Sequence, residues 1–219
     1  MAVLAPSIIS ADFTRLGESL GAVERYASSW HVDVMDGHYV PNLTIGPMVV
    51  EAIAKISSLP QDVHVMISNV DDTWEWYARS GARRIAYHHD QCTDPVKLAD
   101  VIRGTGVGPG LAVNPDVDVA VIEPYLDAID HVIVMSVFPG FSGQKFIPEA
   151  LPKLERLRTL VDGRGGGIDL YIDGGVNQDN AASCVEAGAD VLISASAIFS
   201  AGDPPAVAER LHRIAAGKS

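Results

Sequence analysis

The sequence predicts an α/β protein that folds as a single (β/α)8 barrel over residues 1–219. Three observations support this prediction. Short β-rich runs recur at intervals of roughly 20 to 30 residues, segments with helical spacing lie between most of them, and each of the eight runs is followed by a helix or by a gap long enough for one. Eight strand–helix units are what such a barrel requires. A length of 219 residues is normal for one α/β barrel.

The predicted strands follow one another along the whole chain. In order, they are Val3–Ile8, Trp30–Asp36, Asp62–Ile67, Arg83–His88, Gly108–Pro115, His131–Val137, Ile168–Gly175 and Asp190–Ser196. The glycine-rich piece Gly163–Gly167 precedes the seventh strand instead of following a strand. This position favours a flexible connection over a phosphate-binding loop.

Five segments between the strands have helical spacing. They are Asp12–Ala27, Asp71–Gly81, Asp94–Gly104, Ala150–Val161 and Asn177–Gly188. Several begin at an Asp or Asn that could cap the helix and end at a glycine. The segment from Asp116 to Tyr125 gives the weakest helix prediction, because Pro124 limits it.

Charge and composition restrict the partners and the compartment. Sixteen basic against twenty-eight acidic side chains give a net charge of −12, which argues against nucleic acid or a membrane surface as a partner. An anionic substrate would therefore be held by local backbone donors. No apolar run approaches the roughly 20 residues of a membrane span, and no basic signal-peptide region begins the chain. Cys92 and Cys184 lack metal-ligand spacing, so we expect packed thiols in a cytoplasmic protein.

The second predicted strand carries titratable residues on one face. Side chains alternate along a strand, so His31, Asp33 and Met35 share one face while Val32 and Val34 share the other. The valines can pack on the surrounding helices. The polar face is then expected to point into the barrel mouth, where the active sites of this fold gather at the C-terminal ends of the strands.

The third and seventh strands add polar groups to the same volume. His64 and Met66 share a face of the third strand, and Asp173 ends the seventh. Two imidazoles and two carboxylates from three strands suit one divalent cation such as Zn²⁺, Mn²⁺, Fe²⁺ or Co²⁺, without choosing among them. In the alternative interpretation, His31 and His64 are hydrogen-bonded core residues that pair with Asp33 and the other aspartate.

Other residues near these strand ends have less specific signals. His38 lies in the loop and is interpreted as a surface residue, and Asp36 on the outward face is expected to brace the strand end. Three methionines occupy matching positions near strand ends, where they either fill gaps in the core or form an apolar lid over the reacting atoms. They are Met35, Met66 and Met135.

Glycine-rich loops follow the last three strands. Their segments are PGFSGQ (139–144), DGGVN (173–177) and SASAIF (194–199). Glycine lets the backbone approach an anion closely, and helices are expected right after the second and third loops. Loops after strands seven and eight are where this fold usually builds a phosphate site. Any single glycine could instead serve a turn; those concerned are Gly140, Gly143, Gly174 and Gly175.

Six segments carry a resemblance to a known family. LAPSIISADF, HVDVMDGHYVPNLTIGP, DVHVMI, VMSVFPGFSGQKFIP, DGGVN and SAIF together resemble the ribulose-phosphate 3-epimerases nearly end to end. The resemblance implies a TIM barrel, one metal ion on His31, Asp33, His64 and Asp173, and acid–base roles for the two aspartates. It also implies substrate contacts at Ser7, His64, Met35, Met66, Met135, Gly140, Phe141, Ser142, Gly143, Gly174, Gly175, Ala195 and Ser196.

The implied activity interconverts D-ribulose 5-phosphate and D-xylulose 5-phosphate. One carboxylate removes the C3 proton and the other returns a proton to the opposite face, through an enediolate that a metal ion stabilises as a Lewis acid. No organic cofactor is required. Homo-oligomers are common among such enzymes, so we expect a homo-oligomer, although no interface signal specifies it. The metal and the physiological pathway are left open.

Four positions depart from the family pattern near the expected phosphate site. Phe138 and Ser142 replace an asparagine and a glycine, and Ser194 and Ala195 stand where alanine and glycine are usual. Asp90 also replaces a common glutamate. A methyl group at 195 would strain the loop only if its φ were positive. Alternatives therefore stay open: an epimerase of a related ketose phosphate such as allulose 6-phosphate, a metal-assisted lyase or hydrolase, or a non-catalytic sugar-phosphate binder.

Overall fold

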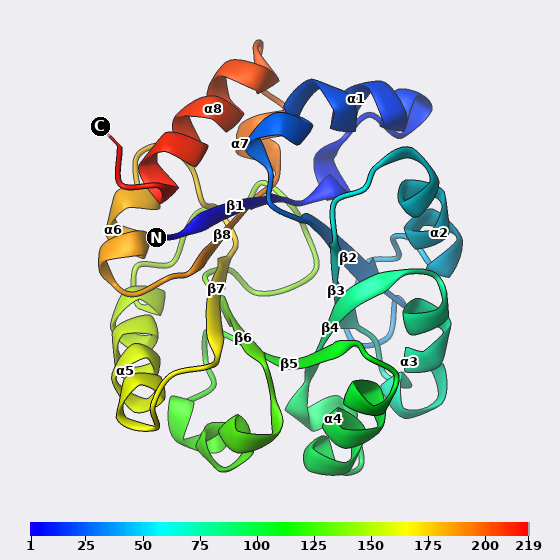
Figure 1. The fold of residues 1–219 in the computed structure, drawn as a ribbon, viewed down its shortest axis with the longest axis vertical. Coiled ribbons are helices and arrows are strands. Elements are labelled where there is room, and N and C mark those ends of the chain that lie inside the picture. The colour runs from blue at the N-terminus through cyan, green and yellow to red at the C-terminus, as the bar shows by residue number, and fades with distance from the viewer. Residues whose placement is uncertain (219) are drawn as a thin grey trace.

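The computed structural model describes residues 1–218, and eight parallel strands form the ring at its centre (Figure 1). The strands are β1 (Val3–Pro6), β2 (Trp30–Met35), β3 (Gln61–Met66), β4 (Ala82–His88), β5 (Gly108–Val113), β6 (His131–Met135), β7 (Asp169–Asp173) and β8 (Val191–Ser194). From β2 to β8 each strand pairs with the next one in sequence, and β1 pairs with β8. A parallel bridge between Ser7 and His31 joins the β1 and β2 ends of the sheet. The predicted (β/α)8 barrel is confirmed.

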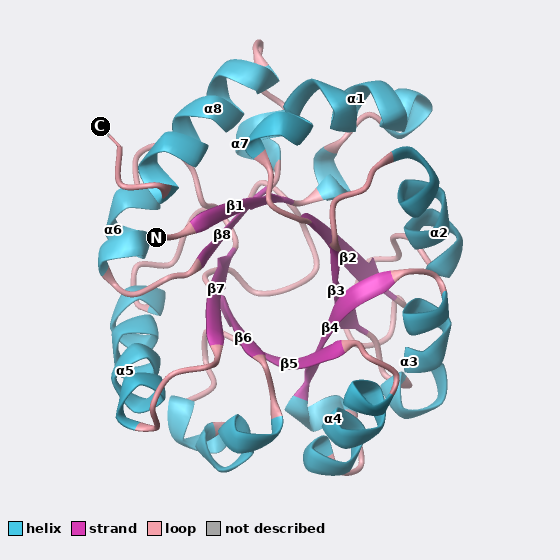
Figure 2. Cartoon of the chain, viewed as in Figure 1, coloured by secondary structure: helices cyan, strands magenta, loops and turns pink. Residues whose placement is uncertain are grey.

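Helices surround this ring, as Figure 2 shows. They are α1 (Leu16–Val23), α2 (Pro47–Ile56), α3 (Val70–Arg79), α4 (Pro95–Gly104), α5 (Ala150–Gly163), α6 (Ala181–Glu186), α7 (Ser196–Phe199) and α8 (Pro204–Ala215). Asp94 caps α4 as predicted, because its carboxylate accepts hydrogen bonds from the backbone N–H groups of Val96 and Lys97. Within residues 1–218, no helix has the length and apolarity needed to cross a membrane.

Several connections differ in detail from the sequence prediction. The stretch around Asp116–Tyr125 holds two 3₁₀ helices, Val119–Val121 and Glu123–Ala128, instead of an α-helix. Pro124 lies in the first turn of the second one, where its missing N–H costs nothing. The helices α2 and α8 occupy gaps for which no helix bounds were predicted, and each begins with a proline.

The apolar core has two layers, one on each side of the strands. Outside the ring, residues such as Val32 and Val34 pack under the helices in the larger cluster. Inside it, a smaller cluster contains Ala5, Ala86 and Ala112 among its buried members. These small side chains leave room in the barrel interior for the larger polar groups that the neighbouring strands direct inward.

Candidate active site

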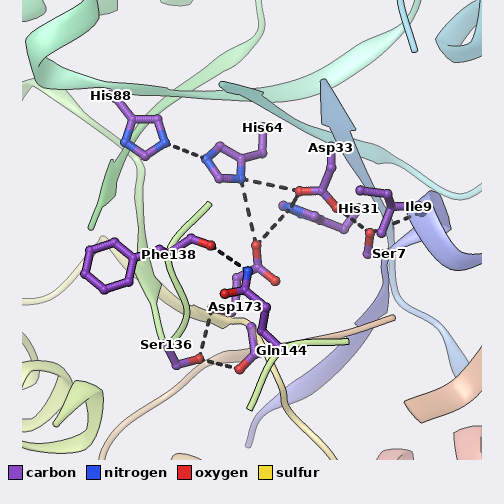
Figure 3. A network of polar contacts seen from close by, with 11 residues as sticks. Ser7, Ile9, His31, Asp33, His64, His88, Ser136, Phe138, Gln144 and Asp173 are labelled. Atoms are coloured by element: carbon purple, nitrogen blue, oxygen red, sulfur yellow. Dashed lines mark hydrogen bonds and ion pairs between the residues drawn. The ribbon is translucent and has the colours of Figure 1, made fainter. Parts of the chain in front are cut away.

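Four side chains meet at the C-terminal end of the barrel (Figure 3). His31 and Asp33 come from β2, His64 from β3 and Asp173 from β7. One potential ligand atom from each residue lies within 4.8 Å of the corresponding atoms of the others. The structure thus brings together the four residues for which metal binding was predicted.

The histidines contact both carboxylates at short range. His31 Nε2 lies 3.2 Å from Asp33 Oδ1, and His64 Nδ1 lies 3.5 Å from the same oxygen. Asp173 Oδ2 lies 3.8 Å from each of these two nitrogens. Both imidazoles are completely buried, and the two aspartates are nearly so.

Three buried imidazole nitrogens of this cluster have no hydrogen-bond partner. They are Nδ1 and Nε2 of His31 and Nδ1 of His64. Buried polar atoms without partners are rare and need an explanation. A divalent cation that accepts lone pairs from imidazole and carboxylate groups supplies one for His31 Nε2 and His64 Nδ1, which face the carboxylates, and such mixed N and O donors suit several transition metals. The cluster is therefore consistent with a metal site.

The two aspartates have opposite electrostatic environments. Burial, together with repulsion from the Asp33 carboxylate, raises the pKa of Asp173 to about 7. Burial acts in the same direction on Asp33, but the positive charge of His31 outweighs it and holds the pKa of Asp33 well below its usual range. Burial likewise opposes protonation of His31, yet Asp33 raises the pKa of His31 to about 9. The site therefore contains one ionised and one protonatable carboxyl group near neutral pH.

Hydroxyl groups fix the carboxylates and their strands. Ser7 Oγ donates a hydrogen bond to Asp33 Oδ2. Thr44 Oγ1 donates to the Asp33 carbonyl at 2.7 Å and accepts from the Met35 N–H at 2.9 Å. Ser136 Oγ lies 2.9 Å from the Asp173 carbonyl oxygen, to which it donates. Our sequence analysis missed Thr44 and Ser136, because they act through tertiary contacts that no periodicity reveals.

A cavity of about 500 Å³ opens beside the carboxylates. Its lining contains Asp33, Asp173 and nearly all residues for which substrate contacts were predicted: Ser7, Met35, Met66, Met135, Gly140, Phe141, Ser142, Gly143, Gly174, Gly175, Ala195 and Ser196. His64 is not part of the lining, because it is completely buried behind the carboxylates. The three methionines line the cavity and are almost inaccessible to solvent. They give it an apolar wall next to the acid–base groups.

The glycine-rich loops form the other end of the cavity. Gly174 and Gly175 have φ values of 117° and 64°, in the region that only glycine adopts easily. A side chain at Gly175 would also lie 2.6 Å from the Phe146 backbone nitrogen. Ala195, in contrast, has a φ of −115°, outside the left-handed region that favours glycine. The departure from glycine at this position is therefore compatible with the loop.

The two residues to which structural or surface roles were assigned lie outside the cluster. Asp36 accepts hydrogen bonds from the backbone N–H groups of His38 and Tyr39 and from both the N–H and the hydroxyl of Ser68. It thereby braces the end of β2 against the β3 loop. His38 has 79% of its side chain exposed.

The fold and the position of this site define a class, an α/β-barrel enzyme with acid–base groups at the C-terminal ends of its strands. Comparison with known proteins identifies the family. The model of the ribulose-phosphate 3 epimerase family matches residues 3–199. The chain is 43% identical to a ribulose-phosphate 3-epimerase of Mycobacterium tuberculosis, covering 99% of this chain and 94% of that one. It is 42% identical to that of Bacillus subtilis, covering 93% and 94%. The chain belongs to the ribulose-phosphate 3-epimerase family.

Solved structures show the same fold at low sequence identity. The 3-hexulose-6-phosphate synthase of Salmonella typhimurium aligns with a TM-score of 0.71 and 15% identity, covering 99% of this chain and 100% of that one. A tryptophan synthase α-subunit from Pyrococcus furiosus aligns with a TM-score of 0.69 and 12% identity, covering 99% and 97%. At such identities the likeness concerns the barrel alone.

Proposed function

We propose that the protein is a metal-dependent epimerase that interconverts D-ribulose 5-phosphate and D-xylulose 5-phosphate by proton transfer at C3. Family membership supports the substrate, and one observation of the structure supports the mechanism. Asp33 and Asp173 lie on separate strands, face the same cavity and have pKa values shifted in opposite directions. A reaction that removes a proton from one face of a carbon and returns one to the other needs such a pair.

In this mechanism, the ionised Asp33 takes the C3 proton and the C–H electron pair moves toward the adjacent carbonyl group. The resulting enediolate then receives a proton from Asp173 on the opposite face, which inverts C3. In the reverse direction the two carboxyl groups exchange roles. Ser7 keeps Asp33 oriented through its hydrogen bond to Oδ2.

His31, Asp33, His64 and Asp173 would hold the divalent cation. When bound, the cation would supply Lewis-acid stabilisation of the negative charge that develops on the substrate oxygens. Met35, Met66 and Met135 exclude water from the reacting carbon because they are buried and apolar. The cavity volume of about 500 Å³ is appropriate for a small phosphorylated sugar.

The phosphate group fits the end of the cavity that the glycine-rich loops form. Gly143 and Gly175 both have positive φ values, which allow backbone N–H groups to approach an anion closely. Lys145 is the one cationic side chain among the residues that line the cavity. The backbone donors therefore carry most of the phosphate binding in a protein with a net charge of −12.

The test is an epimerase assay in D₂O with both D-ribulose 5-phosphate and allulose 6-phosphate. We expect turnover of the pentulose phosphate with deuterium incorporated at C3 and no C–C cleavage. Asp33→Asn and Asp173→Asn should each lower kcat by about 10²- to 10⁴-fold. Metal analysis of the same preparation should find one divalent ion per chain. Preference for the hexulose phosphate, carbon–carbon cleavage, or full activity of Asp33→Asn would contradict the proposal.

A further inference from the structure

A second buried histidine pair lies behind the metal-ligand cluster. His64 Nε2 lies 3.0 Å from His88 Nε2, a hydrogen-bonding distance, and both rings are buried in the barrel interior. Figure 3 shows His64 between His88 on one side and the carboxylates of Asp33 and Asp173 on the other. The two nitrogens of His64 therefore face different partners, Nε2 toward His88 and Nδ1 toward the carboxylates.

This contact restricts the protons that the two rings can carry. A hydrogen bond between two imidazole nitrogens needs exactly one proton between them, so one ring donates and the other accepts. Each neutral imidazole ring carries a single N–H. If His64 donates from Nε2, its Nδ1 carries a lone pair directed at the cluster. If His64 accepts, its Nδ1 carries the proton and cannot bind a cation.

We propose that His88 is a positioning residue that accepts a hydrogen bond from His64 Nε2 and thereby holds His64 in its metal-binding tautomer. This inference rests on the proposed metal-dependent function. A partner on the nitrogen remote from the metal fixes the orientation of a ligating histidine and raises its basicity. Such a partner is usually a carboxylate, a carbonyl group or water. Here a neutral imidazole takes this place, which adds no negative charge behind the ligands.

Packing holds His88 in the position that this role requires. The ring of Tyr39 lies 4.7 Å from the ring of His88, centroid to centroid, and the Tyr39 hydroxyl accepts a 2.8 Å hydrogen bond from Asn114 Nδ2. His88 is 1% exposed, so water does not compete for the contact with His64. The other ligating histidine differs, because neither ring nitrogen of His31 has a hydrogen-bond partner. Of the two histidine ligands, only His64 therefore has a hydrogen-bond partner that a substitution can remove.

Cobalt binding to the purified, metal-stripped protein tests the proposal without reference to activity. The variant His88→Phe keeps an aromatic ring and removes the acceptor, whereas His88→Gln keeps an acceptor oxygen. We expect His88→Phe to weaken Co²⁺ binding by about 10- to 100-fold and to alter the visible d–d spectrum of the bound ion. His88→Gln should remain within about threefold of the wild type in affinity. His131→Gln, which alters a buried barrel histidine outside the cluster, should leave both readouts unchanged.

A measurement on the unaltered chain keeps the proposal testable if His88→Phe does not fold. Long-range ¹H–¹⁵N correlation spectra of the Zn²⁺-loaded protein identify which ring nitrogen carries the proton. We expect the proton on Nε2 of His64 and on Nδ1 of His88, and the opposite assignment would overturn the proposal. Wild-type Co²⁺ affinity and spectrum in a folded His88→Phe would also overturn it.

If the wild type binds no Co²⁺ or Zn²⁺, the metal-dependent function fails together with this inference. If epimerase turnover alone is absent, the role of His88 stands.

Discussion

Asp33 and Val34 are neighbours in β2, but one contacts histidines inside the barrel and the other packs under the helices. The two-residue period of the strand separates them. The local environment then gives two carboxyl groups, those of Asp33 and Asp173, different pKa values. Asp33 lies beside the charge of His31, whereas Asp173 combines burial with repulsion from Asp33, so their pKa values move apart. At the scale of single residues, the alternation of side chains along a strand determines which groups face the cavity. Their electrostatic surroundings determine which carboxyl group is ionised and which can be protonated.

Backbone conformation makes a second distinction at this scale, between Ala195 and Gly175. Because Ala195 has a negative φ, Ala195→Gly should change the KM for ribulose 5-phosphate less than about threefold and cost at most about 1 kcal/mol of folding stability. Gly175→Ala meets a positive φ and a 2.6 Å backbone contact, so it should destabilise by about 1–3 kcal/mol and raise KM at least about tenfold. Steady-state kinetics and urea unfolding of both variants check this. Equal effects of the two substitutions would contradict it.

The β6–α5 connection is held by contacts from elements that are distant in sequence. The hydroxyl groups of Ser10 and Ser142 lie 2.6 Å apart, which links this connection to the β1 end. Asn42 Nδ2 donates to the Gly140 carbonyl at 2.7 Å, which links it to the β2 loop. Gln144 Nε2 donates to the carbonyls of Phe138 and Phe141 and closes the loop on itself. Ser142, one of the departures from the family pattern, thus makes a side-chain hydrogen bond with Ser10 that a glycine at this position could not make.

This hydroxyl pair predicts coupled local dynamics. Ser142→Gly and Ser10→Ala should each raise amide hydrogen exchange in residues 139–146 by about 2- to 10-fold, the effect of losing one hydrogen bond worth roughly 0.5–1.5 kcal/mol. The double variant should exchange no faster than Ser142→Gly, because both substitutions remove the same interaction. Hydrogen-exchange mass spectrometry measures this. Additive effects would show that the two hydroxyl groups act independently.

Packing between β5 and β6 depends on the absence of a side chain at Gly110. A Cβ atom there would lie 2.3 Å from the His131 ring. Gly110→Ala should therefore destabilise the protein by about 1–3 kcal/mol or more, since the ring that the new methyl group meets is buried. The matched control is Gly21→Ala in α1, where nothing lies within 4 Å and a gain of about 0.5–1 kcal/mol is expected. Urea unfolding compares the two. Comparable stability of both variants would contradict the clash.

Across the whole molecule, the parts of the site that follow from strand order and alternation could be predicted from the sequence. His31, Asp33, His64 and Asp173 were placed together because parallel strands present their C-terminal ends at one rim. The same alternation could have identified His88 at the end of β4, but its contact with His64 depends on how adjacent strands pair. Contacts across loops, such as that between Ser10 and Ser142, carry no periodic signal and had to come from the structure.

The barrel interior also contains a polar network at the end opposite the active site. Asp62 accepts hydrogen bonds from the Ser29 hydroxyl at 2.7 Å and from the Tyr171 hydroxyl at 3.2 Å. Arg84 pairs with Asp169 at 2.7 Å. The ring of His131 lies 5.2 Å from that of Tyr171. Titratable groups are thus buried along much of the barrel, which makes the stability of the whole fold sensitive to pH.

The pKa of His131 determines the direction in which this residue changes folding stability with pH. Burial, assisted by the positive charge of Arg84, lowers the pKa of His131 to about 3 from an ordinary value of 6.5. Between these two pH values the unfolded chain binds more protons than the folded one, so this residue reduces stability as pH falls below 6.5. From pH 6.5 to pH 5 its contribution amounts to about 2 kcal/mol.

The loss of unfolding free energy over that pH range should therefore be smaller in His131→Gln than in the wild type by about 2 kcal/mol. Urea unfolding at both pH values, at constant ionic strength, measures the difference. His38→Gln serves as the control, because it makes the same substitution at an exposed position outside the barrel interior. Because the comparison uses the change in unfolding free energy between the two pH values, any pH-independent loss of stability from placing glutamine in the barrel cancels. Parallel stability curves for His131→Gln and the wild type would show that His131 becomes protonated without unfolding the barrel.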